Sequence, residues 1–150
     1  MEIWAIITPL IKVLLYILSF LAVGTGLFIL HFRSLLSQPT FAYCCKLVSK
    51  ASLIGSIIAP LLLLMTAGNI GGDLQSAFDP LMISIALSSK AGQSILVLFF
   101  GFLLVLLWIS PFQNQRLISG ILGFALILSS FSLYGHSTIN GLSSQLLIVL

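Results

Sequence analysis

The sequence predicts an all-α protein, a small bundle of transmembrane helices, and three observations lead to this prediction. Of 150 residues, 59% are hydrophobic and only 6% are charged. A soluble domain carries about 25% charged residues, so these charges are too few to cover a surface in water. The charged residues also separate long uncharged runs, as loops separate membrane helices. We expect one transmembrane domain with four complete helices and the start of a fifth.

The first helix is expected over residues 3–32. Lys12 and Arg33 bracket an uncharged run of about 20 residues, which at about 1.5 Å per residue crosses a hydrocarbon core of about 30 Å. The preceding segment contains Trp4 and Pro9, which suit a membrane interface and a helix start. We interpret it as an interfacial lead-in continuous with the helix. No basic n-region or A-x-A site accompanies this segment, so no cleavable signal peptide is predicted.

Three further complete helices follow from the same pattern, over residues 47–68, 91–110 and 117–135. The third ends at Ser110 because Pro111 disfavours helical geometry in the residue before it. The last segment, 141–150, is apolar and uncharged. As a helix it covers only about 15 Å, and a chain ending there leaves its carboxylate at membrane depth, which is costly. We therefore expect residues 1–150 to be the N-terminal part of a longer protein.

The distribution of charge predicts the orientation of the bundle. The basic residues in or next to the first and third connections are Arg33, Lys46, Lys50 and Arg116. The second connection, residues 69–90, instead holds Asp73 and Asp79 with one lysine. The positive-inside rule places the first and third connections in the cytoplasm. The N-terminus and the second connection then face outward, toward the periplasm, and Lys12 is the one basic residue that does not fit.

Sequence motifs of enzymes and of nucleic-acid-binding proteins are absent. The chain has no P-loop, G-x-S-x-G, H-E-x-x-H or C-x-x-C motif. It has only three acidic residues, and no lysine- or arginine-rich run suggests nucleic-acid binding. We expect neither an enzyme nor a nucleic-acid partner.

Two histidines are candidate ligands, His31 and His136. The predicted topology places them at opposite ends of the bundle, roughly 25–30 Å apart, so they cannot ligate the same haem or metal ion. His136 is either a hydrated interfacial side chain or a ligand or pH-sensitive gate at the outer mouth. His31 directly precedes the first connection, where an ordinary loop-edge role is the simpler interpretation.

Four sulfur side chains offer soft donors: Met65, Met82, Cys44 and Cys45. Thioethers and thiolates bind soft metal ions, although a methionine in a leucine-rich helix more often fills space. Met82 is expected in a polar outer loop. The adjacent cysteines are expected in the first connection as free thiols, because a bond between neighbouring cysteines is strained and the cytoplasm is reducing.

Three stretches, taken together, resemble the copper-resistance D family (CopD, PcoD and the YebZ-like inner-membrane proteins). They are residues 24–28, residues 66–73 with 79–81 and 88–93, and residues 132–137. The resemblance covers nearly all of this chain and about the first half of the family pattern. It departs from that pattern at residues 88–90, where relatives often read Thr-x-Phe/Tyr-Gly, and at Ser137, where alanine is common.

This resemblance implies a protein of copper homeostasis and resistance in the bacterial inner membrane. It implies copper as the bound metal ion, its transport across that membrane, and a periplasmic copper-binding partner of the CopC type. His136 is the position that matches the family's Gly-His motif, and Met65, Met82 and Asp73 are hypothetical helpers. The alternative is a module that does not transport, either an assembly factor or an anchor subunit of a redox complex.

Overall fold

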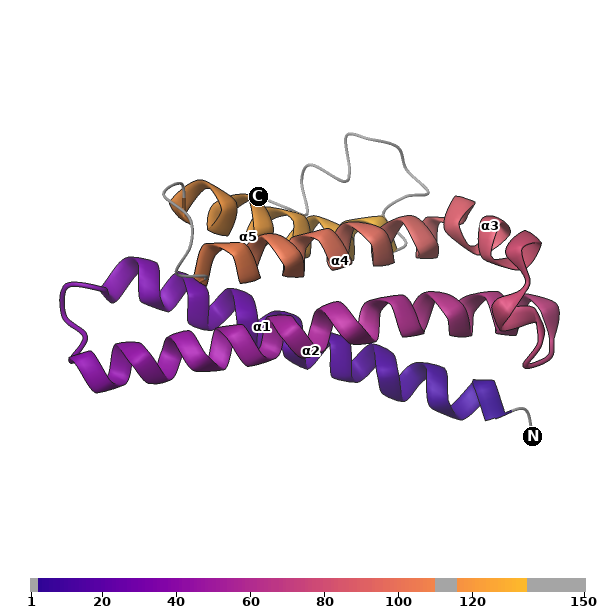
Figure 1. Cartoon of the computed structure of the whole chain (residues 1–150), viewed down its shortest axis with the longest axis horizontal. Helices are drawn as coiled ribbons and strands as arrows, with labels where there is room; N and C mark the ends of the chain where they lie inside the picture. The colour runs from indigo at the N-terminus through magenta and orange to yellow at the C-terminus, as the bar shows by residue number, and fades with distance from the viewer. Residues whose placement is uncertain (1–2, 110–115, 135–150) are drawn as a thin grey trace.

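The computed structural model describes residues 3–109 and 116–134 (Figure 1). Its elements, in chain order, are α1 (Ile3–Phe32), α2 (Gln38–Gly71), the 3-10 turn η1 (Ser76–Phe78), α3 (Pro80–Ser88), α4 (Lys90–Ile109) and α5 (Arg116–Tyr134). Within these two ranges every regular element is helical, which confirms the all-α class. The expected fifth span, 141–150, lies outside the described residues.

The connection between α1 and α2 is much shorter than expected, because α2 begins at Gln38 rather than at residue 47. Pro39 lies in the first turn of α2, where a missing N–H costs nothing. The Ser37 and Thr40 hydroxyls are 2.8 Å apart across this start. The Arg33 guanidinium carbon lies 5.6 Å from the centre of the Phe41 ring. The first connection therefore reduces to a few residues beside Arg33.

Helix α2 has 34 residues and is about 51 Å long, well beyond a hydrocarbon core of about 30 Å. Cys44, Cys45 and Lys46, which were expected in a loop, lie within it. The helix ends where Gly72 adopts a left-handed conformation, with φ of 84°, and its N–H donates to the Gly68 carbonyl at 2.8 Å. Glycine adopts this conformation without strain.

The second connection is a helical cap at this end of the bundle, not a loop. Asp79 is the N-cap of α3: its Oδ1 accepts from the Leu81 N–H at 2.9 Å, and Pro80 occupies the first turn. Met82 consequently lies in α3. The prediction that it lies in a polar loop was wrong, because the Asp-Pro pair is a helix start.

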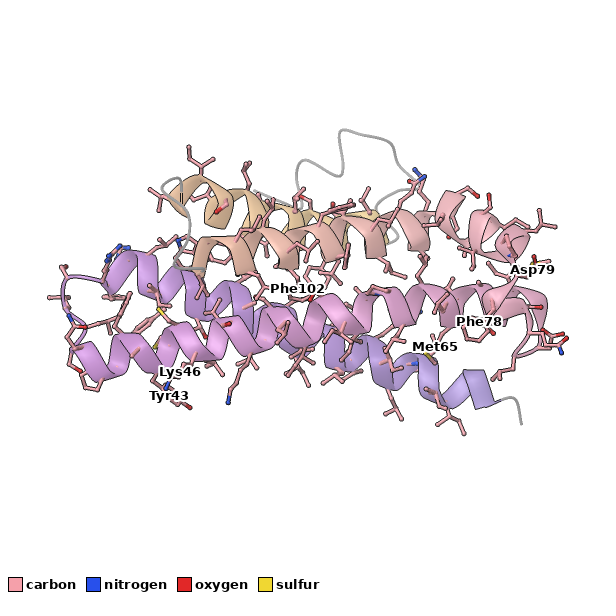
Figure 2. All side chains as sticks on the ribbon, in the orientation of Figure 1. Tyr43, Lys46, Met65, Phe78, Asp79 and Phe102 are labelled. Carbon is pink, nitrogen blue, oxygen red and sulfur yellow. The ribbon has the colours of Figure 1, made fainter. Side chains whose placement is uncertain are left out.

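Helices α4 and α5 pack through close contact of their backbones. A Cβ added to Gly123 would lie 2.9 Å from the Gly101 carbonyl oxygen, and one added to Gly101 would lie 3.1 Å from the Gly123 carbonyl oxygen. Helix α4 also packs on α2, where the fully buried Phe102 ring covers Gly55 (Figure 2). Small residues at helix contacts are typical of bundles in lipid.

Three helices of the described part are long and apolar enough to cross a membrane: Ile6–Phe32, Gln38–Gly71 and Lys90–Ile109. Helix α5 has 19 residues, about 28 Å, and its segment Leu117–Leu133 is a shorter apolar helix. The chain is a multi-pass membrane protein.

The helices run alternately in opposite directions (Figure 1). The start of α1, the end of α2, helix α3 and the start of α4 lie at one end, which we call the Asp73 end. Helix α5 also ends toward it, because the Ser94 hydroxyl near the start of α4 donates to the Ser130 carbonyl near the end of α5. The opposite end, which holds the connection between α1 and α2, is the Arg33 end.

Candidate functional site

Asp73, one of the predicted site residues, closes the turn that follows α2. Its Oδ1 accepts from the Ser76 N–H at 2.7 Å. Hydrogen bonding from the Ser76 side chain, and then from its backbone, lowers the pKa of the Asp73 carboxyl. The side chain is exposed. Asp73 therefore holds a turn at the surface, which occupies part of its capacity to bind a metal ion.

Met82 and Met65 both lie toward the Asp73 end but on different sides of α2. A Cβ added to Gly71 would lie 3.6 Å from Met82 Cγ, so Met82 packs beside Gly71, which the Ser76 side chain covers. Met65 is six residues earlier, about 9 Å along the helix and about 120° around it. It projects from the side of α2 that faces α1, away from α3 (Figure 2). The structure does not bring the two thioethers to one point.

The remaining candidate donors are dispersed. His136 lies outside the described residues. His31 is exposed at the Arg33 end, with its ring 4.7 Å from that of Phe32. Cys44 is buried and Cys45 half-buried, and both are free thiols as predicted. Across the described ranges, no three His, Cys, Asp or Glu side chains are grouped to hold a metal ion.

A small, mostly apolar cavity between the helices was not anticipated from the sequence. It measures about 30 Å³ and all four long helices contribute to it. Its lining residues are Lys12, Leu15, Tyr16, Leu62, Ser94, Ile95, Leu98, Ser130 and Phe131. A space of this size holds roughly one or two water molecules. The signal in the sequence was the single lysine inside an otherwise uncharged apolar run.

The register of the helices places this cavity part-way along the bundle, nearer the Asp73 end. Ser94 is four residues inside the start of α4 and Ser130 four residues inside the end of α5, or about 6 Å in each case. Lys12 and Leu62 are each nine residues inside the ends of their helices, or about 14 Å. Helix α1 runs through Lys12 without a break, as expected for a lead-in that is continuous with the first helix.

The hydrogen bonds around the cavity decide what it can bind. The Ser94 hydroxyl donates to the Ser130 carbonyl at 2.7 Å, and the Ser130 hydroxyl donates to the Ile127 carbonyl at 2.7 Å. Each hydroxyl has one hydrogen, so both oxygens have only lone pairs left to offer. Lys12 supplies donors without acceptors. The cavity therefore combines a partly buried amine with hydroxyl acceptors.

Comparison with known families decides the class of protein. The family of copper resistance protein D-like N-terminal domains matches residues 1–145. The chain belongs to this family. The copper resistance D-like domain thus accounts for nearly the whole bundle, and the protein is a copper-resistance membrane protein. No curated protein and no solved structure matches the chain.

Proposed function

We propose that this copper resistance D-like domain takes part in moving copper ions across the bacterial inner membrane. The observation that carries the proposal is the family match over residues 1–145 on a bundle of membrane-length helices. Copper is the cargo in this scheme. It passes between ligands by exchange, and no covalent bond of the protein changes.

The entry point that we propose is the Asp73 end. Asp73 lies at this end on the surface, and Met82 packs beside Gly71, two residues before Asp73 in the chain. His136 follows the last residue of α5 by two positions in the sequence, and α5 ends toward the Asp73 end. Thioether and imidazole groups suit copper ions. Among these residues, His136 is our first choice for a copper ligand, and Met82, Asp73 and Met65 are helpers.

We further propose that the Asp73 end faces the periplasm and receives copper from a periplasmic copper-binding protein of the CopC type. The charges support this orientation. The Arg33 end holds Arg33 and the exposed Lys46 of α2, whereas the Asp73 end holds two aspartates and Lys90. An excess of basic residues marks the cytoplasmic side.

The test is the copper content of cells that produce the intact protein, with His136→Ala compared against wild type at equal membrane levels. His31→Ala is the matched control, because it removes an exposed imidazole from the Arg33 end of the bundle. We expect wild type and His31→Ala to change cellular copper alike, and His136→Ala to lose most of that change.

A copper content that ignores expression of the protein altogether would contradict transport. It would favour the module that does not transport, an assembly factor or an anchor subunit. A copper content that follows expression but is unaffected by His136→Ala would keep the pathway and reject His136 as a ligand.

A further inference from the structure

The outer face of α2 carries basic and aromatic side chains near its start, and the described helices leave them uncovered. Tyr43 is 68% exposed, and Lys46 and Lys50 are exposed as well. These three residues lie within about 60° of one another around the helix, because residues three, four and seven apart share a face. Figure 2 shows Tyr43 and Lys46 pointing away from the rest of the bundle. We call the three residues the basic stripe.

The same face of α2 continues beyond the basic stripe as an apolar surface. Ile54, Ile57 and Leu61 follow at helical spacing and are all exposed, whereas the opposite side of α2 is buried against α1 and α4. Leu61 is eleven residues beyond Lys50, or about 16 Å along the helix. Half of a hydrocarbon core is about 15 Å thick, so the apolar part of this face matches the depth of one leaflet.

The positive charge of the basic stripe is not offset by acidic side chains of the described residues. Within residues 3–109 and 116–134 the acidic residues are Asp73 and Asp79, and both lie at the Asp73 end. Lys50 is 21 residues before the end of α2, or about 31 Å away along the helix. Salt screens charges that are separated by more than about 10 Å, so the stripe attracts anions from its surroundings.

We propose that this face of α2 binds an anionic phospholipid. The ammonium groups of Lys46 and Lys50 contact its phosphodiester, the Tyr43 hydroxyl donates a hydrogen bond to it, and the acyl chains lie along the apolar surface that follows. Lysine suits this position because its stem packs on apolar surface while its charged end reaches the headgroups. Tyrosine is likewise typical of the membrane interface. A bound lipid would fix how deeply α2, which is longer than the hydrocarbon core, sits in the membrane.

The experiment measures the binding of single lipid molecules to the intact protein in detergent, without copper, by native mass spectrometry. The probes are phosphatidylglycerol, which is anionic, and phosphatidylcholine, which is zwitterionic, with identical acyl chains. Lys50→Gln removes one charge of the stripe, and Lys50→Arg retains it. Arg33→Gln is the matched control at the same end of the bundle. The Arg33 guanidinium carbon lies 5.6 Å from the centre of the Phe41 ring, and Phe41 is about 180° around α2 from Lys50.

We expect wild type to bind phosphatidylglycerol more tightly than phosphatidylcholine. Lys50→Gln should bind phosphatidylglycerol roughly fivefold more weakly, the effect of one basic residue at a membrane surface, whereas Lys50→Arg and Arg33→Gln should bind it as wild type does. Phosphatidylcholine binding should be equal in all four proteins, which shows that the variants are folded.

Equal binding of the two lipids by wild type would overturn the proposal. Equal losses in Lys50→Gln and Arg33→Gln would also overturn it, because they would show a diffuse attraction to the Arg33 end and no site on the outer face of α2. Because copper is absent, neither result depends on the transport proposal.

Discussion

At the scale of single residues, glycine determines how closely the helices pack, and serine hydroxyls form hydrogen bonds within their own helices. Glycine allows the backbones of α4 and α5 to approach closely at Gly101 and Gly123, and it makes room for the Phe102 ring at Gly55. Serine hydroxyls such as Ser19 donate to the carbonyl four residues earlier, at 2.8 Å, which keeps them satisfied within lipid. The spacing between these helices therefore depends on the positions of the glycines at their contacts.

Gly123→Ala should destabilise the bundle. The new methyl group would lie 2.9 Å from the Gly101 carbonyl oxygen and from the Val105 backbone nitrogen, so whole helices must move apart. Overpacking costs about 1–3 kcal/mol, which exceeds the gain of about 1 kcal/mol in helix propensity. We expect a net loss of about 1 kcal/mol in the free energy of unfolding, measured by denaturation in mixed micelles.

Gly24→Ala is the matched control for Gly123→Ala. A Cβ at Gly24 meets no atom within 4 Å, so the gain in helix propensity is unopposed and stability should stay equal or rise. If the two alanine variants lose stability equally, close packing of α4 and α5 at Gly123 is not what sets the spacing of these helices.

The Asp73 turn should loosen only in acid. Hydrogen bonds from Ser76 lower the pKa of Asp73, so the carboxylate that holds the turn is fully formed above the usual pKa of an aspartate. It is lost as pH falls through the lowered pKa. The Ser76 amide proton signal should follow this titration by NMR. In Asp73→Asn the amide signal should lose this pH dependence, and an unchanged titration in that variant would assign the transition to another group.

At the scale of elements, the C-terminal end of α2 and the short helix α3 determine the structure of the Asp73 end. Gly72 ends α2 in a left-handed conformation, η1 makes the turn, and Asp79 starts α3. Helix α3 then packs against both α2 and α4, so the connection between them is a fixed structure. Met82 and Asp73 owe their positions to this cap.

Asp79→Ala should fray the start of α3. The Asp79 carboxylate accepts from the Leu81 N–H, and loss of an N-cap costs about 1 kcal/mol. Hydrogen exchange of the first-turn amides of α3 should accelerate about fivefold, with α4 unchanged. Asp79→Asn keeps an acceptor oxygen and should exchange nearly as slowly as wild type. Equal exchange in all three proteins would show that packing on α2, and not the cap, holds α3.

The elements also show what the sequence could and could not predict. Charges at the ends of apolar runs predicted α1, α4 and α5 to within a residue or so of their observed bounds. The start of α2 was predicted too late in the chain because of Lys46 and Lys50. Exposed lysines are compatible with a helix that extends beyond the hydrocarbon core as well as with a loop. Helix α3 was not predicted, because residues 69–90 have the composition of a loop. The Asp79-Pro80 pair was nevertheless a signal for the start of a helix.

The candidate site was harder to predict than the fold. Sequence reasoning selected donors by chemical type, but Met65 and Met82 lie on different sides of α2, which only the rotation of the helix determines. It used Lys12 to mark one end of an uncharged run, because charged residues usually flank membrane spans. The position of Lys12 beside Leu62, Ser94 and Ser130 depends on the register of four packed helices, which a one-dimensional pattern does not contain.

At the scale of the whole molecule, the alternating helices give the bundle two chemically different ends. The Asp73 end holds two aspartates and one lysine, Lys90, and α3 covers it. At the Arg33 end, basic residues line the extended pair formed by α1 and α2, which reaches beyond α4 (Figure 1). An excess of basic residues at one end is the charge pattern that sets the orientation of a membrane protein.

The proposed orientation predicts which residues can be labelled from outside the cell. Leu74→Cys introduces a thiol at the Asp73 end, at a position that is 69% exposed. Ser34→Cys introduces one in the exposed connection at the Arg33 end. A membrane-impermeant maleimide should label Leu74→Cys in intact spheroplasts and Ser34→Cys only after permeabilisation, each measured above the wild-type background. The reverse pattern would invert the topology.

The most direct measurement of the central claim is copper flux into liposomes that contain the intact protein, recorded with a copper-sensitive dye in the lumen. The account predicts faster entry than in protein-free liposomes, a rate that His31→Ala preserves, and a rate close to the protein-free value for His136→Ala. Equal entry with and without the protein would contradict the claim that this bundle moves copper.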